Sequence, residues 1–186
     1  MSSKIQNSTL TGIALIALIL LTRSSHFGTH ALLPDATLAA LFLTGMLMQK
    51  VRWLAIAIVV AFAVDFYAVG FAGVSDYCMS LGYWGLIPTY AMVWGAGRLL
   101  AKQAQPFALQ SFVATAWLVT SLAFVVSNAF WYAFSDKVST LSIAEFSQGV
   151  AQYYTPYLSY TMFYLALAWV ARVALLKLSM AQNKVA

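Results

Sequence analysis

The stretch DFYAVGFAGVSDYCMSLGYW, residues 65–84, decides how this chain is organised. It leaves one apolar segment, crosses a turn that contains Gly70 and Gly73, and enters a second apolar segment. It also carries Cys78, the only cysteine in the chain. A carboxylate, a thiol, several tyrosines and a tryptophan therefore gather where a membrane helix is expected to reach the surface, and this predicts a site there.

Composition narrows the class of protein before any motif is considered. The chain has 186 residues, of which 62% are hydrophobic and only 8% are charged. A soluble domain carries about 25% charged residues, so a folded water-soluble protein is excluded. Because a helix needs roughly 20 apolar residues to cross a bilayer, the length allows about six crossings. Residues 1–186 are therefore expected to form a single membrane domain.

The apolar segments are expected to be helices, because backbone groups in lipid must be satisfied within the segment. The first is interpreted as a retained helix and not as a cleaved signal peptide. Pro88 and Pro156 fall within helical stretches and should each mark a kink or a late start. The sequence thus predicts an all-α integral membrane protein with six transmembrane helices, at residues 9–22, 32–48, 51–70, 81–100, 107–134 and 150–176.

The distribution of lysine and arginine predicts the orientation. With the N-terminus inside, eight basic residues fall on the inner side and only Arg23 and Lys137 on the outer side, so both termini are expected to be cytoplasmic. All five acidic residues, both histidines and Cys78 then lie on or near the outer side. The basic residues sit between apolar runs, which argues against nucleic acid as a partner. No phosphate-binding glycine loop is present, so nucleotide hydrolysis by this chain is not expected.

Asp65 is the only carboxylate inside an apolar run. A charge at the centre of a membrane helix costs roughly 2.5–3.5 kcal/mol on insertion scales, so Asp65 should face a cavity or a partner. Two interpretations are open: a functional group at a ligand site, or a hydrogen bond to Arg23 that only fixes packing. We favour the first, because ionisable groups within membranes are by default functional.

Cys78 is the strongest candidate for chemistry. A free cysteine is commonly a small buried hydrophobe, but Cys78 lies outside the apolar runs, between Tyr77 and Met79. Thiolate is a soft metal ligand. One thiolate cannot build a zinc or iron–sulfur site, which needs several ligands at defined spacings. It suits a metal that arrives already ligated by a macrocycle and lacks only an axial partner.

Other outer residues could contact a ligand. His26 is expected to donate to it, whereas His26 and His30 make a weak metal pair because Gly28 favours a loop between them. Aromatic rings could line the pocket of a large flat ligand. Alternatively, the same rings could form an aromatic belt at the membrane surface. The aromatic candidates are Tyr77, Trp84, Trp131, Tyr132, Tyr153, Tyr154 and Tyr157.

Taken together, these features resemble a known family. Six helices in 186 residues, termini inside and a binding face outside resemble the substrate-binding S-components of energy-coupling-factor (ECF) vitamin transporters. His26, Asp65, the segment VSDYCMSLGY at 74–83 and the outer tyrosines are similar to the BtuM group, the cobalamin-specific S-components of Gram-negative bacteria. The architectural resemblance covers essentially the whole chain, and its specific part rests mainly on the cysteine segment.

The resemblance implies a protein of the bacterial inner membrane that binds cobalamin (vitamin B12) and takes it up. It implies that Cys78 ligates the cobalt and that His26, Asp65 and Tyr83 line the pocket. It further implies removal of the cyano ligand from cyanocobalamin, with Cys78 as the catalytic residue, and partners in an ECF transmembrane subunit and two ATPases. The first helix departs from the family pattern, because it lacks the Ala-x-x-x-Ala repeat that docks the transmembrane subunit.

Two alternatives stay open beside this reading. A membrane thiol enzyme would use Cys78 as a nucleophile and would need His26 or His30 as a base. An S-component for a different vitamin would use Cys78 only for packing. Small-residue patterns at Ala36-x-x-x-Ala40 and Ala57-x-x-x-Ala61 would allow close helix approach, either within the chain or to a partner.

Overall fold

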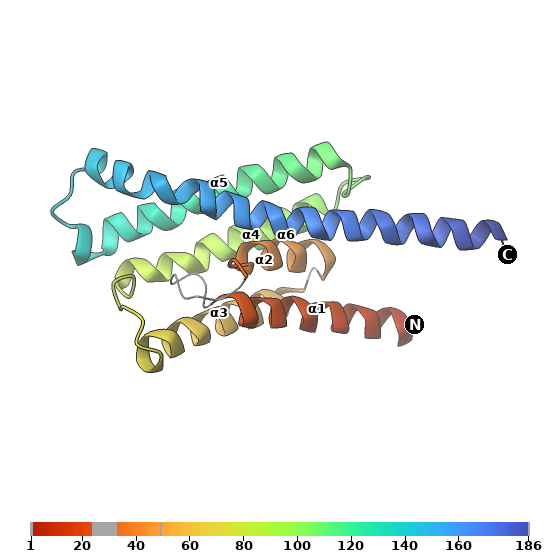
Figure 1. Cartoon of the computed structure of the whole chain (residues 1–186), viewed down its shortest axis with the longest axis horizontal. Helices are drawn as coiled ribbons and strands as arrows, with labels where there is room; N and C mark the ends of the chain where they lie inside the picture. Colours follow the sequence, from red (N-terminus) through yellow and green to blue (C-terminus); the bar gives the residue numbers. More distant parts are fainter. Residues whose placement is uncertain (1, 24–32, 49, 186) are drawn as a thin grey trace.

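The structure, a computed structural model, describes residues 2–23, 33–48 and 50–185, and it describes side-chain surroundings for 9–23, 33–48 and 50–179. His26 and His30 therefore lie outside the described residues. All regular secondary structure in the described part is helical, and this part has no β-strand (Figure 1). Its α-helices are α1 (Ser2–Thr22), α2 (Thr37–Leu47), α3 (Val51–Phe71), α4 (Leu86–Leu100), α5 (Leu109–Phe134) and α6 (Ile143–Val185), with short 3-10 helices η2 (Leu81–Gly85) and η3 (Asp136–Val138).

Three of these helices contain stretches that are long and apolar enough to cross a membrane, namely Val51–Phe71, Leu109–Phe134 and Ile143–Ser179. Shorter apolar helices cover Thr9–Thr22 and Thr37–Leu47. The prediction of an all-helical protein is thus confirmed for the described residues, and three helices have the length and composition that a membrane crossing needs. Six crossings and the orientation of the termini stay predictions.

Capping groups explain where the helix ends differ from the sequence expectation. The second helix begins at Thr37 and not at 32. Its N-cap residue, Ala36, makes no side-chain cap, and the Asp35 carboxylate just before it accepts the Thr37 backbone N–H at 2.8 Å. The sixth begins at Ile143 and not at 150, because Ser142 and Glu145 form a reciprocal capping box.

The two prolines act differently. Pro88 lies in the first turn of α4, which begins at Leu86 after the 3-10 helix η2, so the late start predicted there is confirmed. Pro156 lies inside α6, which runs through it as one continuous helix.

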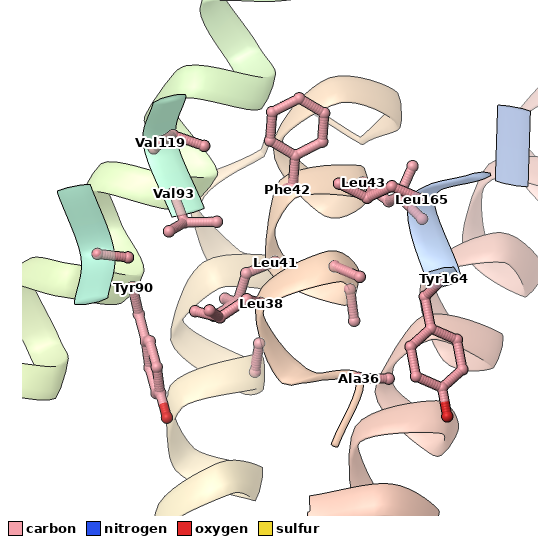
Figure 2. Packing of buried hydrophobic residues seen from close by; sticks show 14 of the residues in the cluster. Ala36, Leu38, Leu41, Phe42, Leu43, Tyr90, Val93, Val119, Tyr164 and Leu165 are labelled. Carbon is pink, nitrogen blue, oxygen red and sulfur yellow. The ribbon is translucent and has the colours of Figure 1, made fainter. Parts of the chain in front are cut away.

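Helix α2 is the centre of the bundle. Every residue from Thr37 to Met46 is buried, so this helix presents no face to the surroundings. Figure 2 shows its Leu38, Leu41 and Phe42 packed among side chains of α4, α5 and α6. Because α2 is enclosed by other helices, its short length need not match the thickness of a bilayer.

Close backbone approach joins α2 to α4. A Cβ atom placed on Gly45 would overlap the carbonyl oxygen of Trp94, and one placed on Gly97 would overlap the carbonyl oxygen of Phe42. Only glycine allows the two backbones to come this near, as in other small-residue helix contacts.

The alanine patterns found in the sequence serve packing within the chain. Ala36, Ala40, Ala57 and Ala61 are all buried. They are therefore not surfaces left free for a partner helix.

The bundle has two chemically different ends (Figure 1). Both chain termini, the α2–α3 turn and the α4–α5 connection lie at one end, which we call the basic end because it carries Lys50, Arg52, Arg98, Lys102 and Arg172. The α3–η2 loop with Cys78 and the α5–α6 connection lie at the opposite end, which we call the thiol end.

Candidate functional site

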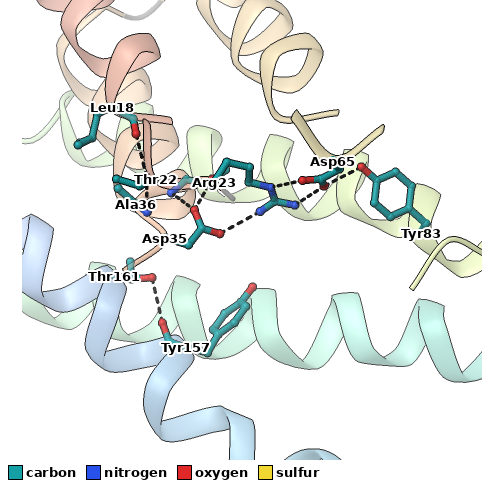
Figure 3. Close-up of polar contacts among 10 residues, drawn as sticks. Leu18, Thr22, Arg23, Asp35, Ala36, Asp65, Tyr83, Tyr157 and Thr161 are labelled. Carbon is teal, nitrogen blue, oxygen red and sulfur yellow. Dashed lines mark hydrogen bonds and ion pairs between the residues drawn. The ribbon is translucent and has the colours of Figure 1, made fainter. Parts of the chain in front are cut away.

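A buried cluster of charges lies beneath the thiol end. The Arg23 guanidinium donates from Nε to Asp65 Oδ1 at 2.8 Å and from Nη2 to Asp65 Oδ2 at 2.7 Å. Its Nη1 donates to Asp35 Oδ2 at 3.0 Å, and the Tyr83 hydroxyl donates to Asp65 Oδ2 at 2.8 Å (Figure 3). We call Arg23, Asp35, Asp65 and Tyr83 the Arg23 cluster. It joins the end of α1, the start of α2, helix α3 and η2.

Burial makes the cluster depend on its own hydrogen bonds. The Asp65 side chain is 0% exposed and that of Arg23 is 3% exposed. Removing two charges from water costs several kcal/mol per ion, which mutual attraction offsets only when the geometry is good and the remaining polar atoms are bonded. Both conditions hold, because Arg23 binds Asp65 through two parallel bonds and both carboxylates accept further donors.

The structure thus identifies the hydrogen-bond partner of Asp65, which the sequence did not decide. The hydrogen bond to Arg23, named above as the packing alternative, is present, and Tyr83 adds a second donor. Contact of Asp65 with a ligand stays a prediction, because the carboxylate is enclosed by its protein partners in this structure.

The 3-10 helix η2 is pressed against α5 and carries Tyr83 into the cluster. A Cβ atom on Gly82 would lie 2.6 Å from the Cα atom of Trp131, and one on Gly85 would overlap the Phe130 side chain. The Tyr83 ring also packs on the Phe62 ring at 5.0 Å between centroids. Packing and hydrogen bonding therefore fix η2 on two sides.

Cys78 precedes η2 in the sequence and is exposed. Its carbonyl oxygen accepts the Ser80 N–H at 3.1 Å, and the Ser80 carbonyl accepts the Tyr83 N–H at 3.0 Å. Desolvation by the surrounding protein and the negative charge of Asp65 raise the pKa of the Cys78 thiol, and the positive charge of Arg23 opposes part of this rise. The thiol is thus accessible, tied to a fixed helix and protonated near neutral pH.

Exposed aromatic residues lie on either side of Cys78 in the sequence. The Tyr77 residue is 48% exposed and its ring meets Trp131 edge to face at 5.4 Å. Trp84 is 51% exposed and packs edge to face on Phe62 at 5.7 Å. Rings held by other rings but open on one side can stack on a flat ligand.

The two predicted site residues of α6, Tyr153 and Tyr157, lie in different surroundings. Tyr157 is half-buried, contacts Phe124 edge to face at 5.3 Å, and rises from α6 toward the Arg23 cluster (Figure 3). Tyr153 lies one turn earlier and is 61% exposed. The structure therefore brings Tyr157 near the cluster and leaves Tyr153 on the surface.

Three residues of this region were missed or undervalued from sequence. Arg23 was considered only as a packing partner and Asp35 only as one of the outer acids. Tyr90, on α4, was not singled out; it is 2% exposed, and its ring centroid lies 5.9 Å from the Arg23 guanidinium carbon. The Tyr90 hydroxyl has no hydrogen-bond partner among the described residues. The sequence signal that could have pointed to these residues was Arg23 itself, because it is a basic residue on the predicted outer side, where the acidic residues lie.

No group of three or more histidine, cysteine or acidic residues within the described parts of the chain could hold a metal ion. In comparisons with known proteins, neither a protein-family model nor a curated protein matches the chain. The chemistry of the site is therefore the basis for assigning a function.

Proposed function

We propose that this chain binds cobalamin at its thiol end and carries it across the bacterial inner membrane, with Cys78 as an axial ligand of the cobalt. The observation that carries the proposal is the placement of Cys78, an exposed thiol on a loop that is tied by hydrogen bonds to a firmly packed helix. A corrin ring supplies the other ligands of its cobalt, so a single well-placed thiolate is sufficient.

The aromatic surroundings support a large flat ligand. Tyr77 and Trp84 lie on either side of Cys78 in the sequence and both are exposed, and each is held from behind by another ring. Such rings give contact area at little loss of conformational entropy, because they are already fixed before the ligand arrives.

The raised pKa of the thiol counts against Cys78 as a nucleophile and is compatible with a metal ligand. A catalytic cysteine needs a lowered pKa or an adjacent base, whereas the pKa of Cys78 is raised. A metal removes the proton as it binds, so a raised pKa weakens cobalt ligation without preventing it. We expect slow alkylation of Cys78 at neutral pH, and rapid alkylation would favour the thiol enzyme.

The proposal includes six membrane crossings with both termini in the cytoplasm. The three longest apolar stretches supply three of these crossings. Helix α2 is surrounded by the others and needs no lipid contact. The basic end would face the cytoplasm, because lysine and arginine are retained there, and the thiol end would face outward. Removal of the cyano ligand and docking of ECF subunits stay predictions from the family resemblance.

A binding titration tests the proposal. The purified protein in detergent is titrated with cobalamin while its tryptophan fluorescence is recorded, because Trp84 and Trp131 lie close to the site and a coloured corrin quenches them. We expect Cys78→Ala to weaken binding by more than about tenfold, or about 1.4 kcal/mol. Ser75→Ala is the matched control, since it removes one hydrogen bond to Tyr77 from the same loop and keeps the thiol.

The outcomes separate the alternatives. Equal affinity in the native protein and Cys78→Ala would contradict the ligand role of the thiol. Absence of cobalamin binding together with binding of another vitamin would assign the site to that vitamin and leave Cys78 as a packing residue.

A further inference from the structure

The Arg23 cluster joins two stretches of chain that are distant in the sequence. Asp35 precedes α2, whereas Tyr83 belongs to η2, shortly after Cys78. Asp35 accepts from the Arg23 guanidinium, and Asp65 accepts from both Arg23 and Tyr83. A continuous path of charge-assisted hydrogen bonds therefore runs from the start of α2 through Arg23 to η2 (Figure 3).

The path continues along the backbone to the thiol. The Tyr83 N–H binds the Ser80 carbonyl oxygen at 3.0 Å, and the Gly82 N–H binds the Ser80 hydroxyl at 3.2 Å. The Ser80 N–H in turn binds the Cys78 carbonyl oxygen at 3.1 Å. Each of these hydrogen bonds joins residues two or three positions apart, so a displacement of Tyr83 should also move the backbone at Cys78.

Arg23 itself is enclosed. The residue is 2% exposed, and the N–H groups on all three of its guanidinium nitrogens are directed to Asp35 and Asp65. It therefore acts on a ligand at Cys78 only through the residues that it holds.

We infer that Arg23 is a positioning residue of the thiol site: by holding Asp65 in the orientation that anchors Tyr83, it fixes the Cys78 segment above the helices. The identity of the ligand in this inference rests on the proposed function. The geometry of the Arg23 cluster is independent of that function. Lysine cannot replace Arg23, because one ammonium group cannot present parallel bonds to Asp65 and a third bond to Asp35 at the same time.

The single cysteine makes the inference testable without any ligand. A spin label attached to Cys78 reports the motion of its segment by electron paramagnetic resonance in the detergent-purified full chain. We expect faster label motion in Arg23→Lys and in Tyr83→Phe than in the native protein. Tyr83→Phe removes only the hydroxyl and keeps the ring contacts with Phe62, so it carries the test alone if Arg23→Lys does not fold.

A matched control comes from the opposite end of the bundle. Trp169→Phe removes the indole N–H bond to the Phe107 carbonyl oxygen, which measures 3.0 Å, and leaves the Arg23 cluster untouched. It should lower the melting temperature without changing the motion of the label.

Binding by the unlabelled proteins gives the second measurement. We expect Arg23→Lys to bind cobalamin about tenfold more weakly, the equivalent of one charge-assisted hydrogen bond, and to show a smaller thiolate-ligated fraction in the visible spectrum at saturation. Trp169→Phe should stay within about twofold of the native affinity, since it loses no contact near the site.

The two kinds of failure can be told apart. Native-like label motion in a folded Arg23→Lys and in Tyr83→Phe would overturn the positioning role, whatever the protein binds. A native protein that does not bind cobalamin would overturn the proposed function, while faster label motion in both variants would still support the positioning role.

Discussion

The two ends of the bundle are held together by different forces. At the thiol end, Arg23 and Asp65 are buried and form an ion pair, and Arg23 forms a second ion pair with the partly buried Asp35. At the basic end, the backbones of α2 and α4 touch at Gly45 and Gly97, and the arginines lie over aromatic rings at the rim. One end is thus fixed by internal charge and the other by close packing.

We take this difference as support for the proposed site at the thiol end. Close packing of apolar helices is sufficient to hold a membrane bundle together. Buried charge pairs add little stability for their desolvation cost, and they are retained where they fix one particular geometry. The thiol end has such a pair, which is linked through Tyr83 and Ser80 to the Cys78 segment, whereas the arginines of the basic end lie over aromatic rings at the rim.

Breaking the charge cluster should have the largest effect. Arg23→Met leaves the fully buried Asp65 carboxylate without the cation that it binds, so we expect a loss of about 3–5 kcal/mol in the free energy of unfolding. Unfolding in mixed detergents measures it. Adding Asp65→Leu should recover part of the loss, because the buried carboxylate is then removed together with its cation. An unchanged stability in Arg23→Met would mean that the cluster is not buried.

Breaking the close packing at the basic end should come next. In Gly97→Ala the new methyl group overlaps the Phe42 carbonyl oxygen, a backbone atom that cannot move aside, and we expect a loss of about 1–3 kcal/mol. Gly95→Ala on the same helix is the control. A Cβ atom there meets nothing within 4 Å, so the change should stay within about 0.5 kcal/mol. Similar melting temperatures for the two variants would contradict the close approach of α2 and α4.

The pH dependence of binding sharpens the contrast at the thiol end. The pKa of Cys78 is raised, so the free thiol is protonated near neutral pH and must lose its proton to bind cobalt. The apparent affinity for cobalamin should therefore rise with pH, by about tenfold per pH unit below the thiol pKa, and level off above it. Titrations from about pH 6 to 8 measure the slope. Cys78→Ala should lose this slope, and an identical slope in both proteins would assign the proton to another group.

The smallest effect is expected from the charges of the basic end. Arg98→Gln removes the cation that lies 5.3 Å from the centroid of the Trp94 ring, an interaction worth about 0.5–1 kcal/mol where solvent has access. Its melting temperature should fall far less than that of Arg23→Met. A comparable fall in melting temperature in Arg98→Gln and Arg23→Met would show that charges contribute equally to stability at the two ends.

Much of the helical fold could be predicted from the sequence. Long apolar runs separated by short polar turns predict helices, and the α3–α4 region was placed correctly on either side of Cys78. Helix ends were harder to predict, because they depend on single caps. The Ser142–Glu145 capping box extends α6 well before residue 150, and its Ser-x-x-Glu spacing was a signal that could have been used.

The site was predictable in part. The solitary cysteine and the intramembrane Asp65 are conspicuous because each is chemically out of place in an apolar chain. Tyr90 was not predictable, since one aromatic residue among many carries no sign that it lies against a cation. Asp35 was equally hidden, because its bond to Arg23 depends on how the chain returns after α1.

Cobalt ligation by Cys78 can be observed in the visible absorption spectrum of the purified protein with cobalamin, compared between the native chain and Cys78→Ala. We expect the native protein to retain the vitamin with the altered bands of a thiolate-ligated corrin, and Cys78→Ala to show the bands of the free vitamin. Identical spectra of bound cobalamin in the two proteins would contradict cobalt ligation by Cys78.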